Sequence, residues 1–247
     1  MANSRSGESM TERIVRVLDT FAGDRTAQTA AEIGRRAGLP ASTAHRVVAD
    51  LVRSGLLERD TDHRVRLGMR LWELALHGSA VLRLRRVALP HMDQVQSAIR
   101  QHTQLAVLED DEALIVERLS HPEATENVTR ITGRLPLRSS SAGLVLLAHA
   151  DPPLRERVLA GSPPAQRPAL ARVLGGIRRA GHVVAPGLVD AGATGVAVPI
   201  RDAGAVVAAL SVVLPRTESS DDSVRALRAA ARAIEAELRA SRRQGSS

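Results

Sequence analysis

The stretch GLPASTAHRVVADLVRSGLLERD, Gly38 to Asp60, places two hydroxyl side chains and an arginine at the start of an amphipathic segment. Its apolar residues have the i, i+3, i+4, i+7 spacing of one buried helix face and are Ala44, Val47, Val48 and Leu51. We therefore predict a helix over residues 40–53, with Pro40 in its first turn. The exposed N-terminal turns of this helix then carry Ser42, Thr43, His45 and Arg46.

The neighbouring segments complete a recognisable order of elements. Apolar residues at 14, 17, 18 and 21 predict a first helix, and Thr29 with Glu32 forms a capping-box pattern that opens a second. After Gly55, the runs LLERD and RVRLG around Thr61–His63 predict a β-hairpin. Helix, turn, helix and hairpin is the order of a winged helix-turn-helix, whose second helix lies in the DNA major groove.

This order assigns a role in DNA binding to each polar residue. Ser42 and Thr43 suit phosphates or bases, and Arg46 can bind a guanine through two hydrogen bonds. Residues 35–70 contain eight arginines and four acidic residues, which gives this stretch a net charge of +4. The predicted DNA-binding residues are Arg35, Arg36, Ser42, Thr43, His45, Arg46, Arg64 and Arg66. The alternative is a helical pair used for protein contacts, with serine and threonine as ordinary caps and the arginines solvated.

The sequence after residue 69 predicts a second unit that contains both helices and strands. Residues 70–86 read as a connecting helix, followed by a helix over 89–102 and a hairpin around the acidic turn 109–112. A helical stretch over 154–181, two alternating strands around Asp202–Gly204 and a final helix over 220–243 follow. The predicted class is α+β, with an antiparallel sheet flanked by helices. The predicted divisions are a disordered segment 1–10, a DNA-binding domain 11–69, a linker helix 70–86 and a second domain 87–247.

Composition excludes several classes of function. The chain has no cysteine, so disulfides and cysteine-ligated zinc are excluded, and its single Phe, single Trp and lack of Tyr argue against stacking of single-stranded nucleic acid. All 34 basic residues are arginine, a bias that GC-rich coding explains as readily as a polyanionic partner. No leader or membrane-spanning pattern is recognised, which predicts a cytoplasmic protein without membrane contact.

Enzymatic motifs are also missing from the sequence. There is no nucleophile elbow, phosphate loop, dinucleotide fingerprint or zinc-protease motif, and the eight histidines are scattered singly. We therefore predict no catalytic residue, no metal site and no cofactor. A small hydrolase is the least favoured alternative.

Three segments of the sequence resemble motifs of one protein family. Residues 31–46 match the pattern A-E-I-x-x-x-x-G-L-P-x-S-T-x-H-R of the IclR family of bacterial transcription regulators. Residues 133–150, GRLPLRSSSAGLVLLAHA, and residues 177–216 resemble two motifs of its C-terminal half. The resemblance spans about residues 11–238. Departures include Val65 in place of a frequent aromatic residue and Arg138 in place of a frequent histidine.

The resemblance implies a winged helix-turn-helix, a linker helix and a GAF-like domain that binds a small effector. Family members are usually homodimers or dimers of dimers that bind pseudo-palindromic double-stranded operators as repressors or activators. The implied function is therefore sequence-specific regulation of transcription, modulated by a small organic molecule. A ligand-binding sensor that uses the helix-turn-helix for protein contacts is the main alternative.

The resemblance also indicates where the effector would bind. The loop 133–141, the Thr194–Gly195 turn and the last strand would line the pocket, and an arginine among 130, 134 and 138 could pair with a carboxylate. The expected effector-binding residues are Arg130, Gly133, Arg134, Leu135, Ser139, Ser140, Thr194, Gly195 and Ser211. Two alternatives remain open: solvated arginines, and a helix N-cap formed by the serines. With so few aromatic residues, we expect an aliphatic pocket and a small or aliphatic ligand.

Overall fold

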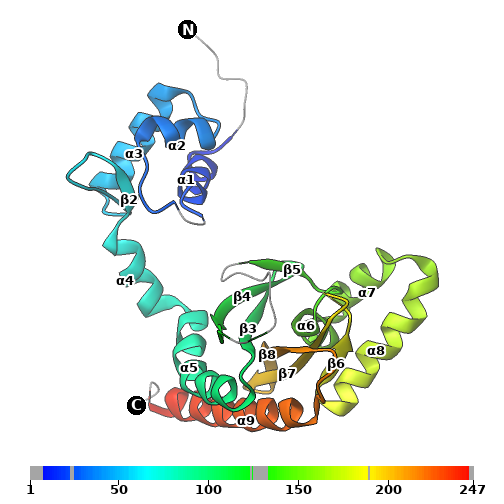
Figure 1. The fold of residues 1–247 in the computed structure, drawn as a ribbon. Helices are drawn as coiled ribbons and strands as arrows, with labels where there is room; N and C mark the ends of the chain where they lie inside the picture. The colour runs from blue at the N-terminus through cyan, green and yellow to red at the C-terminus, as the bar shows by residue number, and fades with distance from the viewer. Residues whose placement is uncertain (1–7, 23–24, 123, 125–132, 189, 245–247) are drawn as a thin grey trace. The chain divides into compact units, whose positions relative to one another are not determined.

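A computed structural model describes residues 8–22, 25–122, 124, 133–188 and 190–244 (Figure 1). The chain forms two compact units, Met1–Ser79 and Ala80–Ser247. Among the described residues, no helix combines the length and the apolar character needed to cross a membrane. In the same part of the chain, no three histidine or acidic side chains gather in a way that could hold a metal ion.

The N-terminal unit contains three helices, a hairpin and a fourth helix. These are α1 (Met10–Asp19), α2 (Ala30–Arg36), α3 (Ala41–Arg53), β1 (Leu57–Arg59), β2 (Val65–Leu67) and α4 (Met69–Gly78). The strands pair antiparallel, with Leu57 opposite Leu67 and Arg59 opposite Val65. The predicted order of helix, helix, helix and hairpin is therefore present.

Capping boxes define the starts of α1 and α2. Thr29 and Glu32 form the predicted box at α2, and Ser9 with Glu12 forms a second one at α1. The segment 1–10 expected to be disordered therefore ends in ordered residues, because Ser9 caps a helix that includes Met10. Residues 1–7 lie outside the described part. The core beneath the helices consists of Val17, Phe21, Ala30, Ile33, Ala37, Leu39, Ala44, Val47, Val48, Leu51, Leu57 and Val65.

The second unit is built on one six-stranded antiparallel sheet with the strand order β5-β4-β3-β8-β7-β6. Its strands are β3 (His102–Glu109), β4 (Glu112–Leu119), β5 (Arg134–Pro136), β6 (Val183–Pro186), β7 (Ala193–Asp202) and β8 (Ala205–Pro215). Its helices are α5 (Ala80–Ile99), α6 (Ser141–His149), α7 (Pro152–Ala160), α8 (Arg167–Ala180) and α9 (Asp221–Gln244), with a short 3-10 helix η1 (Pro164–Gln166).

Helices cover both faces of this sheet (Figure 1). On one face, α5 and α9 pack on a core that includes Leu105, Val198, Leu210 and Ile234. On the other face, α6 lies on the sheet and is backed by α7 and α8, around Ile115, Val145 and Leu147. We name these the α9 face and the α6 face. The expected α+β class with a helix-flanked antiparallel sheet is confirmed.

The predicted linker helix 70–86 is not one helix. It breaks at Ser79, which has extended backbone angles and follows the weak helix former Gly78. The chain then continues as α5 through Pro90 to Ile99, so the predicted start near Leu89 was wrong. Proline removes one helical hydrogen bond. The buried residues Leu84 and Met92, on either side of it, pack in the core of the α9 face and hold the helix together.

The helical stretch predicted over 154–181 is also divided. Pro163 and Pro164 interrupt it, because a proline lacks the amide hydrogen that a continuing helix needs. The two short edge strands β5 and β6 were not predicted, because their few residues carry too little alternation to be recognised.

Candidate DNA-binding surface and effector site

The helix-turn-helix depends on a close approach between α2 and α3. A Cβ atom at Gly34 would lie only 2.8 Å from the Cβ of Ala44. Gly38 turns the chain between the helices with φ of +61°, a left-handed conformation that glycine adopts without strain. The Leu39 amide donates to the Gly34 carbonyl at 2.9 Å. These contacts bury the apolar stripe of α3 and fix which side faces solvent.

The polar side chains at the start of α3 lie on that solvent side. Ser42, His45 and Arg46 are exposed, and Thr43 is half-buried. In the described part of the chain, these four side chains make no hydrogen bond or ion pair with protein groups. Their hydroxyls, imidazole and guanidinium are therefore available to a ligand outside the protein.

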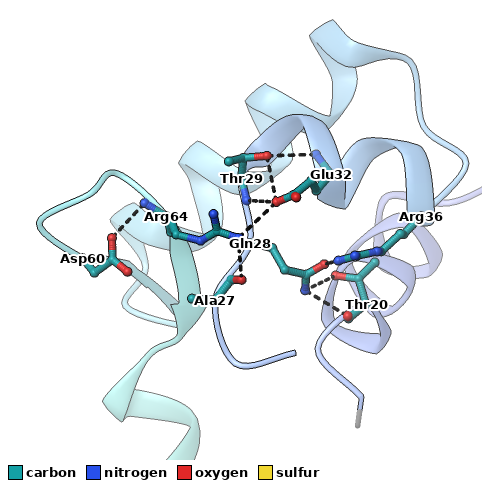
Figure 2. Close-up of polar contacts among 8 residues, drawn as sticks. All are labelled: Thr20, Ala27, Gln28, Thr29, Glu32, Arg36, Asp60 and Arg64. Atoms are coloured by element: carbon teal, nitrogen blue, oxygen red, sulfur yellow. Dashed lines mark hydrogen bonds and ion pairs between the residues drawn. The ribbon is translucent and has the colours of Figure 1, made fainter. Parts of the chain in front are cut away.

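The flanking arginines differ in their partners. Arg35 is exposed and has no polar partner within the described residues. Arg36 donates through Nη1 to the amide oxygen of Gln28, as Figure 2 shows. Arg66 pairs with Glu58, directly opposite on β1, with 2.7 Å between Nε and Oε1. The predicted DNA-binding arginines are thus not equivalent.

Arg64 is the most constrained of them (Figure 2). Its Nη2 atom donates to the Ala27 carbonyl at 3.1 Å and lies 3.4 Å from Glu32 Oε2. Its backbone amide donates to Asp60 Oδ1 at 2.9 Å. The guanidinium is therefore directed toward the start of α2.

The residues expected at the effector site do not form one cluster. Arg130 lies outside the described residues. Gly133, Arg134 and Leu135 lie at or beside the edge strand β5, where Arg134 sits 3.7 Å from Asp110 and 3.8 Å from Glu112. Leu135 packs toward the apolar core of the α6 face.

The consecutive serines 139 and 140 lie in different environments. Ser139 is exposed, whereas Ser140 is buried and its Oγ accepts the Gly143 amide at 3.0 Å. The alternative reading of the run as a helix cap is therefore confirmed for Ser140, which caps α6. Arg138 donates to the hydroxyl of Ser162, at 3.2 Å.

Thr194 and Gly195 face opposite sides of the sheet because they are consecutive in a strand. Thr194 pairs with Leu214, a core residue of the α9 face. Gly195 faces α6, and a Cβ there would lie 2.7 Å from Ser141 Oγ. Ser211 is on the α6 face too, opposite Ala197 on β7.

Strand pairing brings other polar residues, none of them predicted as site residues, beside Ser211. Gln104 on β3 lies between Ser211 on β8 and Arg118 on β4, and His102 enters the same face two residues earlier. His102, Gln104 and Ser211 are at most 6% exposed. The signal available in the sequence was the polar HTQ at the start of an otherwise apolar strand. We call His102, Gln104, Arg118 and Ser211 the polar cluster.

The electrostatics of the polar cluster favour an anion. Burial lowers the pKa of the Arg118 guanidinium, yet arginine remains charged at any physiological pH. The His121 amide donates to His102 Nδ1 at 3.3 Å, so Nε2 carries the proton of a neutral ring. The N-terminus of α6, at Ser141, lies on the same face and adds the positive end of a helix dipole.

Comparison with known proteins agrees with both halves of this description. The profile of the IclR helix-turn-helix domain matches residues 11–61, and that of the bacterial transcriptional regulator IclR C-terminal domain matches residues 78–236. The chain belongs to the IclR family. As an IclR-family protein, it is a transcriptional regulator with a helix-turn-helix DNA-binding domain and a C-terminal effector-binding domain.

Individual IclR-family relatives extend the comparison. An IclR homolog from Microbacterium hydrocarbonoxydans, solved in complex with 4-hydroxybenzoate, is 58% identical, with a TM-score of 0.86 over 94% of this chain and 100% of that one. A homolog from Microbacterium sp. strain HM58-2 is 57% identical, with a TM-score of 0.63 over 94% and 99% of the two chains. The regulator XynR of Escherichia coli is 27% identical, covering 81% of this chain and 84% of its own.

Proposed function

We propose that this IclR-family regulator reads its operator with the first turns of α3. The observation that carries the proposal is the exposure of Ser42, His45 and Arg46 on the side opposite the buried stripe, without protein partners among the described residues. A recognition helix of this class contacts base edges with its N-terminal residues. Arg46 is assigned to a guanine, Ser42 and Thr43 to phosphates or bases, and Arg35 to the backbone beside the groove.

The test uses a labelled duplex selected from random sequence by the full wild-type chain. Arg46→Ala should weaken binding about five- to 150-fold, the equivalent of about 1–3 kcal/mol for a bidentate base contact. Arg53→Ala is the matched control, because Arg53 is an exposed arginine at the other end of α3 that pairs with Asp50. Equal, small losses of affinity in both variants would show that Arg46 does not contact a base. Failure to select any duplex would favour the sensor that uses this unit for protein contacts.

For the effector, we propose a small carboxylate that binds at the polar cluster on the α6 face. Arg118 supplies a charge, His102 and Gln104 supply hydrogen-bond groups, and the α6 N-terminus favours an anion. The relative from Microbacterium hydrocarbonoxydans was solved with 4-hydroxybenzoate, an aromatic carboxylate. A ring of this kind differs from the aliphatic ligand that the composition suggested, but aliphatic side chains can pack against its faces.

Calorimetry with 4-hydroxybenzoate, its neutral amide and phenol separates the contributions to binding. We expect heat of binding for the carboxylate and at least a tenfold weaker response for the amide. Arg118→Gln should abolish the preference for the carboxylate. The matched control Arg134→Gln, at the β5 edge beside Asp110 and Glu112, should keep it. If Arg134→Gln abolished the preference and Arg118→Gln kept it, Arg134 would be the residue that pairs with the carboxylate.

For assembly, we propose a cytoplasmic homodimer joined in part through α4. Met69, Trp72 and Leu76 are each more than half exposed, and their spacing places them on one helix face. A twofold axis would match two such faces and would present two DNA-binding units to a pseudo-palindromic operator. Trp72→Glu should shift the sedimentation mass toward the monomer. Leu74→Glu, which places the same charge on the opposite side of α4, is the matched control. An unchanged mass for Trp72→Glu would exclude α4 from the dimer interface.

A further inference from the structure

The wing, the hairpin of β1 and β2 over residues 57–67, is connected to the body of the DNA-binding unit at Val65, the first residue of β2, and at the preceding residue Arg64. Val65 pairs with Gln28 through two backbone hydrogen bonds, of 2.9 Å and 2.6 Å. Arg64 reaches the Ala27 carbonyl, one residue before Gln28, and the carboxylate of Glu32 (Figure 2). The segment before α2 therefore forms a single antiparallel β-bridge with the wing.

Gln28 is itself held from the other side. It is 1% exposed, and its Nε2 atom donates to the Thr20 carbonyl at 2.9 Å and to the Thr20 hydroxyl at 3.3 Å. Its amide oxygen accepts a hydrogen bond from Arg36. The segment that pairs with the wing is thus bonded to the end of α1 and the end of α2, and it offers a fixed support.

The carboxylate that receives Arg64 is fixed as well. Glu32 Oε2 accepts the Thr29 amide at 2.7 Å and the Thr29 hydroxyl at 3.0 Å in the capping box of α2. These hydrogen bonds, more than the charge of Arg64, lower the pKa of Glu32, so it stays ionised. The oxygen that caps α2 is the one that faces the guanidinium of Arg64.

Arg64 also links this support to the tip of the wing. Asp60 Oδ1 accepts the amides of Asp62 and Arg64, at 3.0 Å and 2.9 Å, and thereby closes the turn between the strands. By contrast, the only ion pair that Arg66 forms within the described residues is with Glu58, inside the hairpin. Of these two wing arginines, only Arg64 connects the wing to α2.

We propose that Arg64 is a positioning residue for operator binding, and that Glu32 is its partner. The pair holds the wing at a fixed angle to α2 and α3, so that the wing and the recognition helix meet the duplex together. Arg64 therefore contributes to affinity through the protein and not as a phosphate contact.

Glu32→Gln gives a test in which the two roles predict opposite signs. Glutamine preserves the capping box, but it removes the charge that holds Arg64. If Arg64 positions the wing, operator binding by the full-length chain should weaken at least threefold. If Arg64 contacts phosphate, removal of a nearby acid should tighten binding. Unchanged or tighter binding by Glu32→Gln overturns the proposal.

The salt dependence of binding gives a second, independent readout. Each phosphate contact contributes about 0.9 to the slope of log affinity against log salt concentration. Arg64→Gln should lower affinity at every salt concentration and leave this slope unchanged. A slope reduced by about 0.9 for Arg64→Gln would assign a phosphate contact and overturn the proposal. Arg66→Gln, which removes the same charge two residues further along the wing, calibrates the measurement.

A double-mutant cycle completes the experiment on the selected duplex. When two residues act as one unit, the second substitution adds little to the first. Glu32→Gln/Arg64→Gln should therefore bind as Arg64→Gln alone does, whereas losses that simply add would overturn the pairing. Thermal unfolding of each variant confirms a folded chain. If Arg64→Gln does not fold, Glu32→Gln alone decides by the sign of its effect.

Discussion

Substitution of Gly34 by alanine tests the helix-turn-helix packing directly. The added Cβ would lie 2.8 Å from the Cβ of Ala44, whereas carbon atoms in normal contact lie about 3.5–4.0 Å apart. Both atoms are attached rigidly to helix backbones, so no side-chain rotation relieves the contact. We therefore expect α2 and α3 to separate locally by roughly 1 Å.

Two opposing terms set the magnitude for Gly34→Ala. Overpacking typically costs about 1–3 kcal/mol, and alanine gains about 1 kcal/mol over glycine in a helix. The expected net loss is about 0–2 kcal/mol for the DNA-binding unit, together with weaker operator binding because α3 shifts.

Gly176→Ala separates these two terms. Gly176 lies within α8, and a Cβ there would meet nothing within 4 Å, so this variant should gain about 1 kcal/mol in its own unit. The helix-propensity terms cancel between the two variants, and their difference of about 1–3 kcal/mol measures the steric cost.

Hydrogen exchange of the full-length chain, read by mass spectrometry on peptides from each unit, measures both stabilities. Ala44→Gly in the Gly34→Ala background removes the opposing Cβ and should restore operator affinity. The reasoning is refuted if Gly34→Ala stabilises its unit as much as Gly176→Ala does and binds the operator with unchanged affinity.

Three further predictions concern the sensor unit. Ser140→Ala removes the cap of α6 and should cost about 0.5–2 kcal/mol, measured by urea unfolding, whereas the exposed neighbour Ser139→Ala should change little. Ile234→Ala opens a cavity beneath α9 and should cost about 2–5 kcal/mol by the same measurement; a smaller loss would show that the helix collapses into the space. His149 is partly buried, and this desolvation lowers its pKa in the folded state. The unfolded chain therefore binds the proton more readily, and stability falls as the pH drops below about 6.5. His149→Gln should make the urea midpoint less dependent on pH between roughly 7.5 and 5.5, and an undiminished dependence would place the effect elsewhere.

Local patterns accounted for much of the fold before any tertiary contact was known. The stripe of α3, the capping box at Thr29 and the hairpins at β1–β2, β3–β4 and β7–β8 depend on residues close in sequence. Their signals are therefore complete within a short window. The exposed side of α3 follows from the same stripe, which is why the polar residues from Ser42 to Arg46 could be placed on it.

Contacts between distant residues decided the rest. Arg64 and Arg66 are equivalent in the sequence, and only the approach of residues 27–32 gives the first a partner outside the hairpin. The polar cluster exists only because strand register places Gln104 between Ser211 and Arg118. Packing on the sheet carries α5 through Pro90, whose local preference is to break the helix. Residue types and spacing set the local elements, whereas pairing across the chain determined which polar groups meet.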